Sequence, residues 1–236
     1  MKLRNSGLSA KKSEEICQEM KALPWDGYIK GFEDQDLLLK LRTYCSRDWL
    51  HSVHINHMLQ LLGDNLKLTA NATVSIQLTY HVEDVLGAYY NGNKTYRTSR
   101  RYRALRELAQ DLATGIHDML AMVGNVDGDH WIALMVNFRQ HKVYYGDSAG
   151  HPINKELRTA YTWWFSEHNE HEFEWVQIDI TEQEDGYLCG LLATNALAHV
   201  LDPNQFDLMD AKVVDAERVN VLKRVIRQHN EKVRTY

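Results

Sequence analysis

The sequence predicts an α+β fold in which a mixed, mainly antiparallel sheet is flanked by helices. Three short apolar runs follow one another in the middle of the chain, at residues 119–123, 131–138 and 142–145, with polar turns between them. Apolar runs of this length that are bounded by turn residues are typical of strands, and tight turns join antiparallel neighbours. Longer segments with helical periodicity lie on both sides of this region. The sequence therefore indicates a central meander covered by helices.

The elements on either side of the meander are predicted from the spacing of their apolar residues. Recurrence every three or four positions indicates a helix, and strict alternation indicates a strand. Before the meander we expect a helix-compatible stretch at 8–22, a short apolar segment at 36–44, a helix after Trp49-Leu50 that contains Val53 to Leu62, a strand at 73–78 and a helix at 100–113. After the meander we expect a helix at 153–168, a fourth strand at 173–180, a buried helix at 189–201 and an amphipathic helix at 213–232.

Length and composition are those of a globular protein. The chain has 236 residues, of which 44% are hydrophobic and 25% are charged, and its formal net charge is −5. This charge gives no general argument for nucleic-acid binding. No segment approaches the roughly 20 consecutive apolar residues that cross a membrane, and the polar N-terminus does not resemble a secretory signal. We therefore expect neither nucleic acid nor a membrane among the partners.

Cysteine usage indicates a reducing compartment. The chain contains three widely spaced cysteines, Cys17, Cys45 and Cys189. An odd number at such spacing predicts neither a disulfide framework nor a zinc site. Because free thiols persist in reducing compartments, we expect the protein in the nucleus or the cytoplasm.

Cys189 is the first candidate for chemistry. It directly precedes an apolar run that we interpret as the buried helix 189–201, so the thiol would lie at a helix N-terminus. Backbone N–H groups at that end of a helix favour a thiolate over a thiol. His130 begins the second run of the meander, and Asp147 directly follows the third. Since a tight turn brings these two strand ends together, His130 and Asp147 should be close although they are 17 residues apart.

A cysteine, a histidine and an aspartate in this arrangement predict nucleophilic catalysis by a thiol. His130 would pair with the thiolate and later protonate the leaving group. Asp147 would accept a hydrogen bond from the other imidazole nitrogen and fix the tautomer. The side chain of Gln183 and the backbone N–H of Cys189 could stabilise an oxyanion, and Gly190 would leave room beside the nucleophile. This chemistry needs neither a metal nor an organic cofactor.

The order of these residues resembles the Ulp/SENP-type cysteine proteases. The family pattern corresponds here to His130-Trp131, Asp147, Gln183 six residues before the cysteine, and Cys189-Gly190. Residues 49–56 are similar to the family's Trp-Leu-Asn-Asp motif before a helix. The resemblance covers roughly residues 40–230. It implies the circularly permuted, adenain/Ulp-type form of the papain-like fold.

The resemblance also implies a substrate. The family consists of peptidases of ubiquitin-like modifiers such as SUMO, so the expected partner is a SUMO-like modifier and its conjugates. In the family two tryptophans wall a narrow tunnel that admits only the Gly-Gly tail of the modifier, and these correspond to Trp49 and Trp131. Flat apolar walls exclude substrate side chains by steric contact. The implied organisation is an N-terminal extension at 1–40 and a catalytic domain at 41–236.

The chain departs from the family pattern at three positions. Asp185 stands where the family usually has Asn, and Leu188 stands where it has Asp before the cysteine. Neither residue supplies the nucleophile, the base or the oxyanion donor, so catalysis can be retained. Ser52 replaces the second Asp of the Trp-Leu-Asn-Asp motif, which the family uses toward its modifier. A divergent protease, or one for another ubiquitin-like protein, fits the sequence as well.

Other interpretations remain open at this point. An acetyltransferase of the same general fold also uses a His, an acid and a Cys. A non-enzymatic module that binds modifiers and a protein-processing enzyme of a mobile element or pathogen are further alternatives. His51, His54 and His57 recur every three residues and could bind a metal, although their spacing favours exposed or packing roles. The basic cluster at 96–103 could contact nucleic acid or an acidic face of a modifier, but a solvated helix start is the favoured interpretation.

Overall fold

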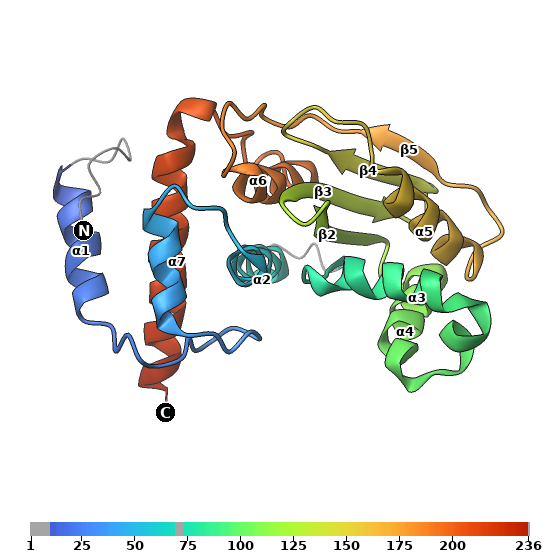
Figure 1. The fold of residues 1–236 in the computed structure, drawn as a ribbon, viewed down its shortest axis with the longest axis horizontal. Coiled ribbons are helices and arrows are strands. Elements are labelled where there is room, and N and C mark those ends of the chain that lie inside the picture. The colour runs from blue at the N-terminus through green and yellow to red at the C-terminus, as the bar shows by residue number, and fades with distance from the viewer. Residues whose placement is uncertain (1–9, 69–72, 236) are drawn as a thin grey trace.

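The computed structural model describes residues 10–68 and 73–235, which contain helices around one sheet (Figure 1). The α-helices are α1 (Ala10–Lys21), α2 (Ser52–Leu68), α3 (Tyr80–Thr98), α4 (Arg103–Thr114), α5 (Lys155–Ser166), α6 (Cys189–Leu201) and α7 (Val214–Arg234). Three short 3-10 helices are η1 (Leu38–Cys45), η2 (Arg100–Tyr102) and η3 (Ala211–Val213). The strands are β1 (Val74–Ile76), β2 (Met119–Val126), β3 (His130–Asn137), β4 (Lys142–Gly146) and β5 (Glu174–Gln177). No helix in this part of the chain is long and apolar enough to cross a membrane.

The five strands form one sheet in the order β1-β2-β3-β4-β5. The pairs β2–β3 and β3–β4 are antiparallel, which confirms the predicted meander, whereas β1 and β5 pair in parallel at the two edges. His130 pairs with Val126 next to the β2–β3 turn, and Gly146 pairs with Ala133. The starting end of β3 therefore lies beside the final end of β4.

The two faces of the sheet lie in two separate hydrophobic cores. Along β2 and β3 alternate side chains point to opposite faces, as the pleat of a strand requires. One face, with Ala121 and Ala133 among its residues, packs against α2 and α6, and α7 continues the same core behind these two helices. The other face, with Met122 and Leu134 among its residues, packs against α3, α4 and α5 (Figure 1). Because both faces are covered, these strands are continuous apolar runs in the sequence.

Helix α6 has the bounds that the sequence predicts. It is 13 residues long and buried over most of its circumference, where it packs across β3 and against α2 and α7. A helix that is apolar on nearly all sides is stable only inside a protein. The position of α6 between the sheet and α7 holds its first residue, Cys189, beside His130 at the start of β3.

The sequence did not indicate helix α3. This helix runs from Tyr80 to Thr98 but contains Gly92 at a φ of 76°, outside the helical region. Glycine adopts this conformation without a steric penalty, and the resulting kink interrupts the helical periodicity. Two shorter helical segments in different directions therefore replace one continuous amphipathic pattern.

The segment before residue 40 packs against the rest of the chain. Ile16 of α1 and Ile29 are fully buried in the core that also contains α6 and α7. A bridge between Tyr28 and Leu37 leads into η1, which lies in the expected apolar segment 36–44. Residues 8 and 9 of the expected stretch 8–22 lie outside the described residues, and the domain boundary at residue 41 stays a prediction.

Candidate active site

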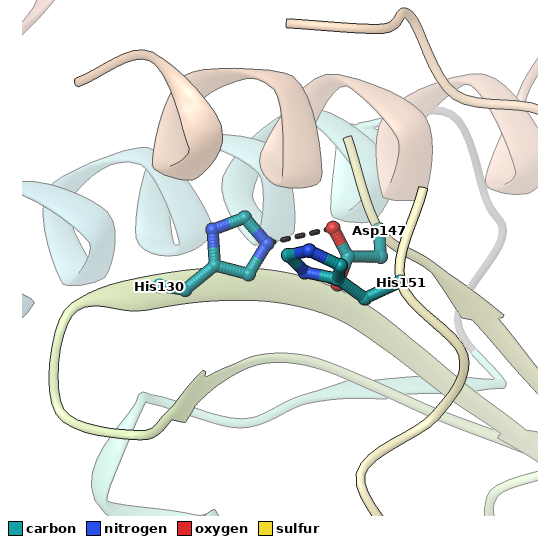
Figure 2. Close-up of side chains that lie close together, drawn as sticks. All are labelled: His130, Asp147 and His151. Atoms are coloured by element: carbon teal, nitrogen blue, oxygen red, sulfur yellow. Dashed lines mark hydrogen bonds and ion pairs between the residues drawn. The ribbon is translucent and has the colours of Figure 1, made fainter. Parts of the chain in front are cut away.

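His130 and Asp147 form a hydrogen-bonded pair where the start of β3 lies beside the end of β4. His130 is the first residue of β3, and Asp147 directly follows β4. The His130 Nε2–H group donates to Asp147 Oδ1 at 2.7 Å (Figure 2). The side chain of Asp147 is 6% exposed and also accepts the N–H of Ala149 at 2.7 Å. The antiparallel register thus brings together two side chains that are 17 residues apart.

The pair strongly favours the charged form of His130. The hydrogen bond to Asp147 is the largest cause, a hydrogen bond to Cys189 is the second, and together they raise the pKa of His130 to about 10. Partial burial of the ring acts in the opposite direction but is outweighed. Because Nε2 faces Asp147, the other ring nitrogen, Nδ1, is left for the thiol. His130 is therefore held between an acid and a sulfur atom.

Cys189 lies at the N-terminus of α6, where it is 1% exposed. The loop before it is organised by Asp185, whose Oδ1 accepts the N–H groups of Tyr187 at 2.9 Å and Leu188 at 3.0 Å. An Asn side chain offers the same acceptor oxygen, which explains why Asp can stand at this position. Leu188 is buried in the core beside α6, so an apolar residue fits there better than an Asp.

Gln183 is tied to the residue that follows Asp147. Its Oε1 accepts the hydroxyl of Ser148 at 2.8 Å, and its backbone N–H donates to the Ser148 carbonyl at 2.9 Å. The amide nitrogen Nε2 donates to the carbonyl of Asp185 at 2.9 Å. These hydrogen bonds place the Oε1 atom of the Gln183 amide toward Ser148 and its Nε2 atom toward the loop before Cys189. The sequence pointed to Gln183 but not to Ser148, whose type and position carry no such signal.

Trp49 and Trp131 lie in direct contact. Their rings stack with an interplanar angle of 12° and a centroid distance of 5.1 Å. Trp131 is held in place because its Nε1–H donates to the carbonyl of Leu50 at 2.7 Å. An extended peptide between two aromatic rings needs about 7 Å, twice the usual contact distance between carbon atoms. The two rings must therefore move apart before a chain can pass between them.

Gly190 lies where α6 touches its neighbours. A Cβ atom at this position would be 2.4 Å from Ile55 Cδ1 and 3.0 Å from Trp131 Cδ1. The space beside Gly190 is therefore filled by side chains of α2 and β3. The absence of a side chain lets the start of α6 approach Trp131 closely.

Arg218 of α7 supports the loop that carries Trp49. It is 1% exposed and donates to the backbone carbonyls of Thr43, at 2.7 Å, and Asp48. Its guanidinium lies 5.5 Å from the ring centroid of Tyr187, two residues before the cysteine. The sequence predicts α7 only as an ordinary amphipathic helix and assigns no role to Arg218. A signal was present, because Arg218 falls on the apolar stripe of that helix.

His54 and His57 of α2 are packing residues rather than metal ligands. His51, directly before α2, is exposed, whereas His54 and His57 are fully buried. Burial is the main cause that lowers their pKa values, to about 4 for His54 and about 3 for His57, so both are neutral. The Tyr44 hydroxyl donates to the carbonyl of His54 at 3.0 Å. These contacts bind η1 to α2.

Much of the basic cluster at 96–103 is used within the molecule. Arg97 forms an ion pair with Glu167 at 2.8 Å. Tyr96 and Tyr102 are each 1% exposed in the core between α3, α4 and α5. Their burial favours a structural role for the aromatic residues of this cluster.

A comparison with known protein families identifies the chain. The sequence model of the Ulp1 protease family, C-terminal catalytic domain, matches residues 48–232. This chain belongs to the Ulp1 protease family. The match begins directly before Trp49 and includes every candidate catalytic residue, so the predicted resemblance is confirmed and the chain is a cysteine protease. No curated protein sequence matches it.

Solved structures confirm the predicted fold of this Ulp1-family chain. The C-terminal Ulp1 protease domain in complex with Smt3, the yeast ortholog of SUMO, is 16% identical with a TM-score of 0.70, over 94% of this chain and 96% of that one. The Ulp1-like SUMO protease catalytic domain of Chaetomium thermophilum is 18% identical with a TM-score of 0.66, over 94% and 90%. The Xanthomonas campestris effector XopD bound to ubiquitin is 18% identical with a TM-score of 0.50, over 74% and 92%. At these identities the likeness shows the fold alone.

Proposed function

We propose that this protease hydrolyses the peptide or isopeptide bond that follows the Gly-Gly tail of a SUMO-like modifier. The observation that carries the proposal is the hydrogen-bonded assembly of Cys189, His130 and Asp147, where α6 meets the ends of β3 and β4. A thiol at a helix N-terminus, next to an imidazole that is paired with a carboxylate, is readily converted to a nucleophilic thiolate. Membership in the Ulp1 family supports the same chemistry.

The geometry supports a two-step reaction. The Cys189 thiolate attacks the carbonyl carbon of the terminal glycine, and His130 gives its Nδ1 proton to the amine as the C–N bond breaks. This leaves a thioester on the enzyme. His130 then takes a proton from a water molecule that attacks the thioester, and the C–S bond breaks to release the carboxylate. Asp147 holds the ring by Nε2, so that Nδ1 stays directed at the sulfur.

Two donors are available for the oxyanion that forms in each step. The Gln183 side chain has two N–H bonds, of which one is used by the Asp185 carbonyl. The second can point at the substrate. The backbone N–H of Cys189 is the other donor, because Asp185 accepts the two preceding N–H groups and leaves this one at the start of α6. Loss of one such donor typically slows a reaction about 10²–10³-fold.

Selection of the substrate is assigned to Trp49 and Trp131. Once the rings separate, the gap between two flat walls accepts glycine and excludes any residue with a side chain. Ser52 at the start of α2 is exposed and can contact the body of the modifier. Since it is not an Asp, the preferred modifier can differ from SUMO, and the structure of XopD bound to ubiquitin makes ubiquitin the first alternative to compare.

We also propose that the protein acts in the nucleus or the cytoplasm. Cys17, Cys45 and Cys189 are all free thiols. Thiols that remain unpaired are typical of reducing compartments.

The proposal is tested by covalent labelling with SUMO, ubiquitin and a NEDD8-type protein, each carrying a C-terminal vinyl sulfone. We expect one of these modifiers to label the native protein and the Cys17→Ala control, and no modifier to label Cys189→Ala. If none of the three labels the native protein while Cys189 still reacts with iodoacetamide, the substrate assignment is wrong. An acetyl-enzyme formed from acetyl-CoA would then favour the acetyltransferase alternative.

A further inference from the structure

His151 lies beside the His130–Asp147 pair, although the proposed reaction gives it no role. The chain turns sharply after β4, where the N–H of Gly150 donates to the carbonyl of Asp147 at 3.0 Å and Gly150 has a φ of 74°. This turn brings the side chain of the next residue, His151, back toward Asp147. Nδ1 of His151 therefore lies 3.7 Å from Asp147 Oδ2, and Figure 2 shows the three side chains converging.

The three side chains provide the donor atoms of a metal site. Two imidazole nitrogens and one carboxylate oxygen lie within 4.8 Å of one another. Within residues 10–68 and 73–235, His130, Asp147 and His151 are the only group of three or more His, Cys, Asp or Glu side chains with this geometry. Two imidazoles and one carboxylate are a known ligand set of zinc sites whose fourth position is open to water. Magnesium and calcium prefer oxygen ligands instead.

The distances fit zinc with small changes. Bonds of about 2.1 Å in tetrahedral geometry place neighbouring ligand atoms about 3.4 Å apart. The separation of 3.7 Å between His151 Nδ1 and Asp147 Oδ2 is already close to this value. His130 Nε2 lies 2.7 Å from the other carboxylate oxygen, Oδ1, which is too short, so zinc can enter only by replacing that hydrogen bond and turning the carboxylate to present one oxygen to both rings. The side chain of His151 is 71% exposed, which leaves it free to complete the site from the solvent side.

We propose that His130, Asp147 and His151 bind a zinc ion that reversibly inhibits the protease. The inhibition rests on the proposed function, because it follows only if His130 is the catalytic base. Zinc on Nε2 displaces the proton of that nitrogen to solvent and takes Asp147 away from the ring. The proton then remaining on the ring is that of Nδ1, so His130 can no longer accept a proton from the thiol or from water.

The site is tested first by binding, without reference to activity. Zinc chloride is titrated by calorimetry into Cys189→Ala protein, which lacks the thiol that could otherwise bind the metal. We expect one zinc ion per chain and no binding of magnesium. Adding His151→Ala should weaken zinc binding at least about 10-fold, since replacing even a residue that only supports a metal ligand costs 10–100-fold. Adding His171→Ala, at an exposed histidine of another loop, should leave the affinity unchanged.

Inhibition is then measured with the modifier that the native protein cleaves. Zinc should inhibit the native protein, and His151→Ala should need at least about 10-fold more zinc for the same inhibition. Without zinc, the two proteins should cleave at similar rates. Equal zinc affinity with and without His151 would overturn the site even if the protease is active. Loss of binding in His151→Ala would support the site even if no modifier is cleaved, so the two proposals can fail separately.

Discussion

His81 provides a sharp test of how the core responds to acid. It is the second residue of α3 and is 4% exposed, next to the rings of Trp164 and Tyr161. Its Nε2 has no hydrogen-bond partner among the described residues. Burial lowers its pKa from 6.5 to about 3. The folded protein therefore keeps this ring neutral over a pH range in which the unfolded chain protonates it.

The sign and size of the effect follow from this difference. A lowered pKa contributes stability above pH 6.5, and the contribution is lost as the pH falls from 6.5 toward 3. At pH 5 the unfolded histidine is 1.5 pH units below its pKa, and each unit corresponds to 1.36 kcal/mol. His81 should therefore lower the free energy of unfolding by about 2 kcal/mol between pH 7 and pH 5. This is a large part of a typical total of about 5–15 kcal/mol.

The assay is urea unfolding of the native protein and His81→Phe at both pH values. Phenylalanine fills a similar volume and does not titrate, so the variant should lose about 2 kcal/mol less than the native protein on acidification. Tyr161→Phe is the matched control. It changes a neighbour of His81, and because burial raises the pKa of Tyr161, its phenol is neutral throughout this range. If His81→Phe and the native protein lose the same free energy, the reasoning about His81 is refuted.

Three further predictions concern the site and its support. Gly190→Ala should lower the free energy of unfolding, measured by urea unfolding, by about 1–3 kcal/mol, because the new Cβ atom overpacks the core. Adding Ile55→Val removes the atom that lies 2.4 Å from this Cβ and should restore part of the lost stability. If Ile55→Val restores none of it, the packing explanation is wrong. Asp147→Asn should slow modifier cleavage about 10⁴-fold, because the amide no longer stabilises protonated His130. Thermal unfolding of the variant should stay cooperative, which shows that the fold is intact. A cleavage rate within 10-fold of the native rate would exclude a role of Asp147 in supporting His130. Arg218→Met should lower the free energy of unfolding, measured in urea, by about 1–3 kcal/mol, because it leaves the backbone carbonyls of Thr43 and Asp48 without a donor. An unchanged urea midpoint would show that water replaces the guanidinium as the donor.

The parts of the fold that the sequence predicted are those encoded over short distances. The runs at 119–123, 131–138 and 142–145 became an antiparallel meander, because tight turns leave neighbouring strands no other pairing. The apolar run after Cys189 became α6 with the expected bounds. The edge strands β1 and β5 were predicted as strands, but their parallel pairing depends on which side of the sheet the intervening helices cross.

In the active site, too, contacts between neighbouring elements follow from the sequence, whereas contacts between distant segments do not. The closeness of His130 and Asp147 follows from the meander, and their separation of 2.7 Å agrees with it. The stacking of Trp49 on Trp131, by contrast, joins residues 82 positions apart in the chain, and their direct contact had no local signal. Arg218 could be placed on an apolar stripe, but its partners lie 175 and 170 residues earlier.

The sequence alone determined the strands of the meander, the helix behind Cys189 and the order of the candidate catalytic residues. Each of these depends on side-chain periodicity or on turns of a few residues, which act within one element or between neighbours. The tertiary structure alone decided that the tryptophan rings touch, that Ser148 orients Gln183, and that His151 returns to Asp147. These contacts arise where separate elements pack together, and their geometry is set by the shape of the whole core rather than by any local pattern.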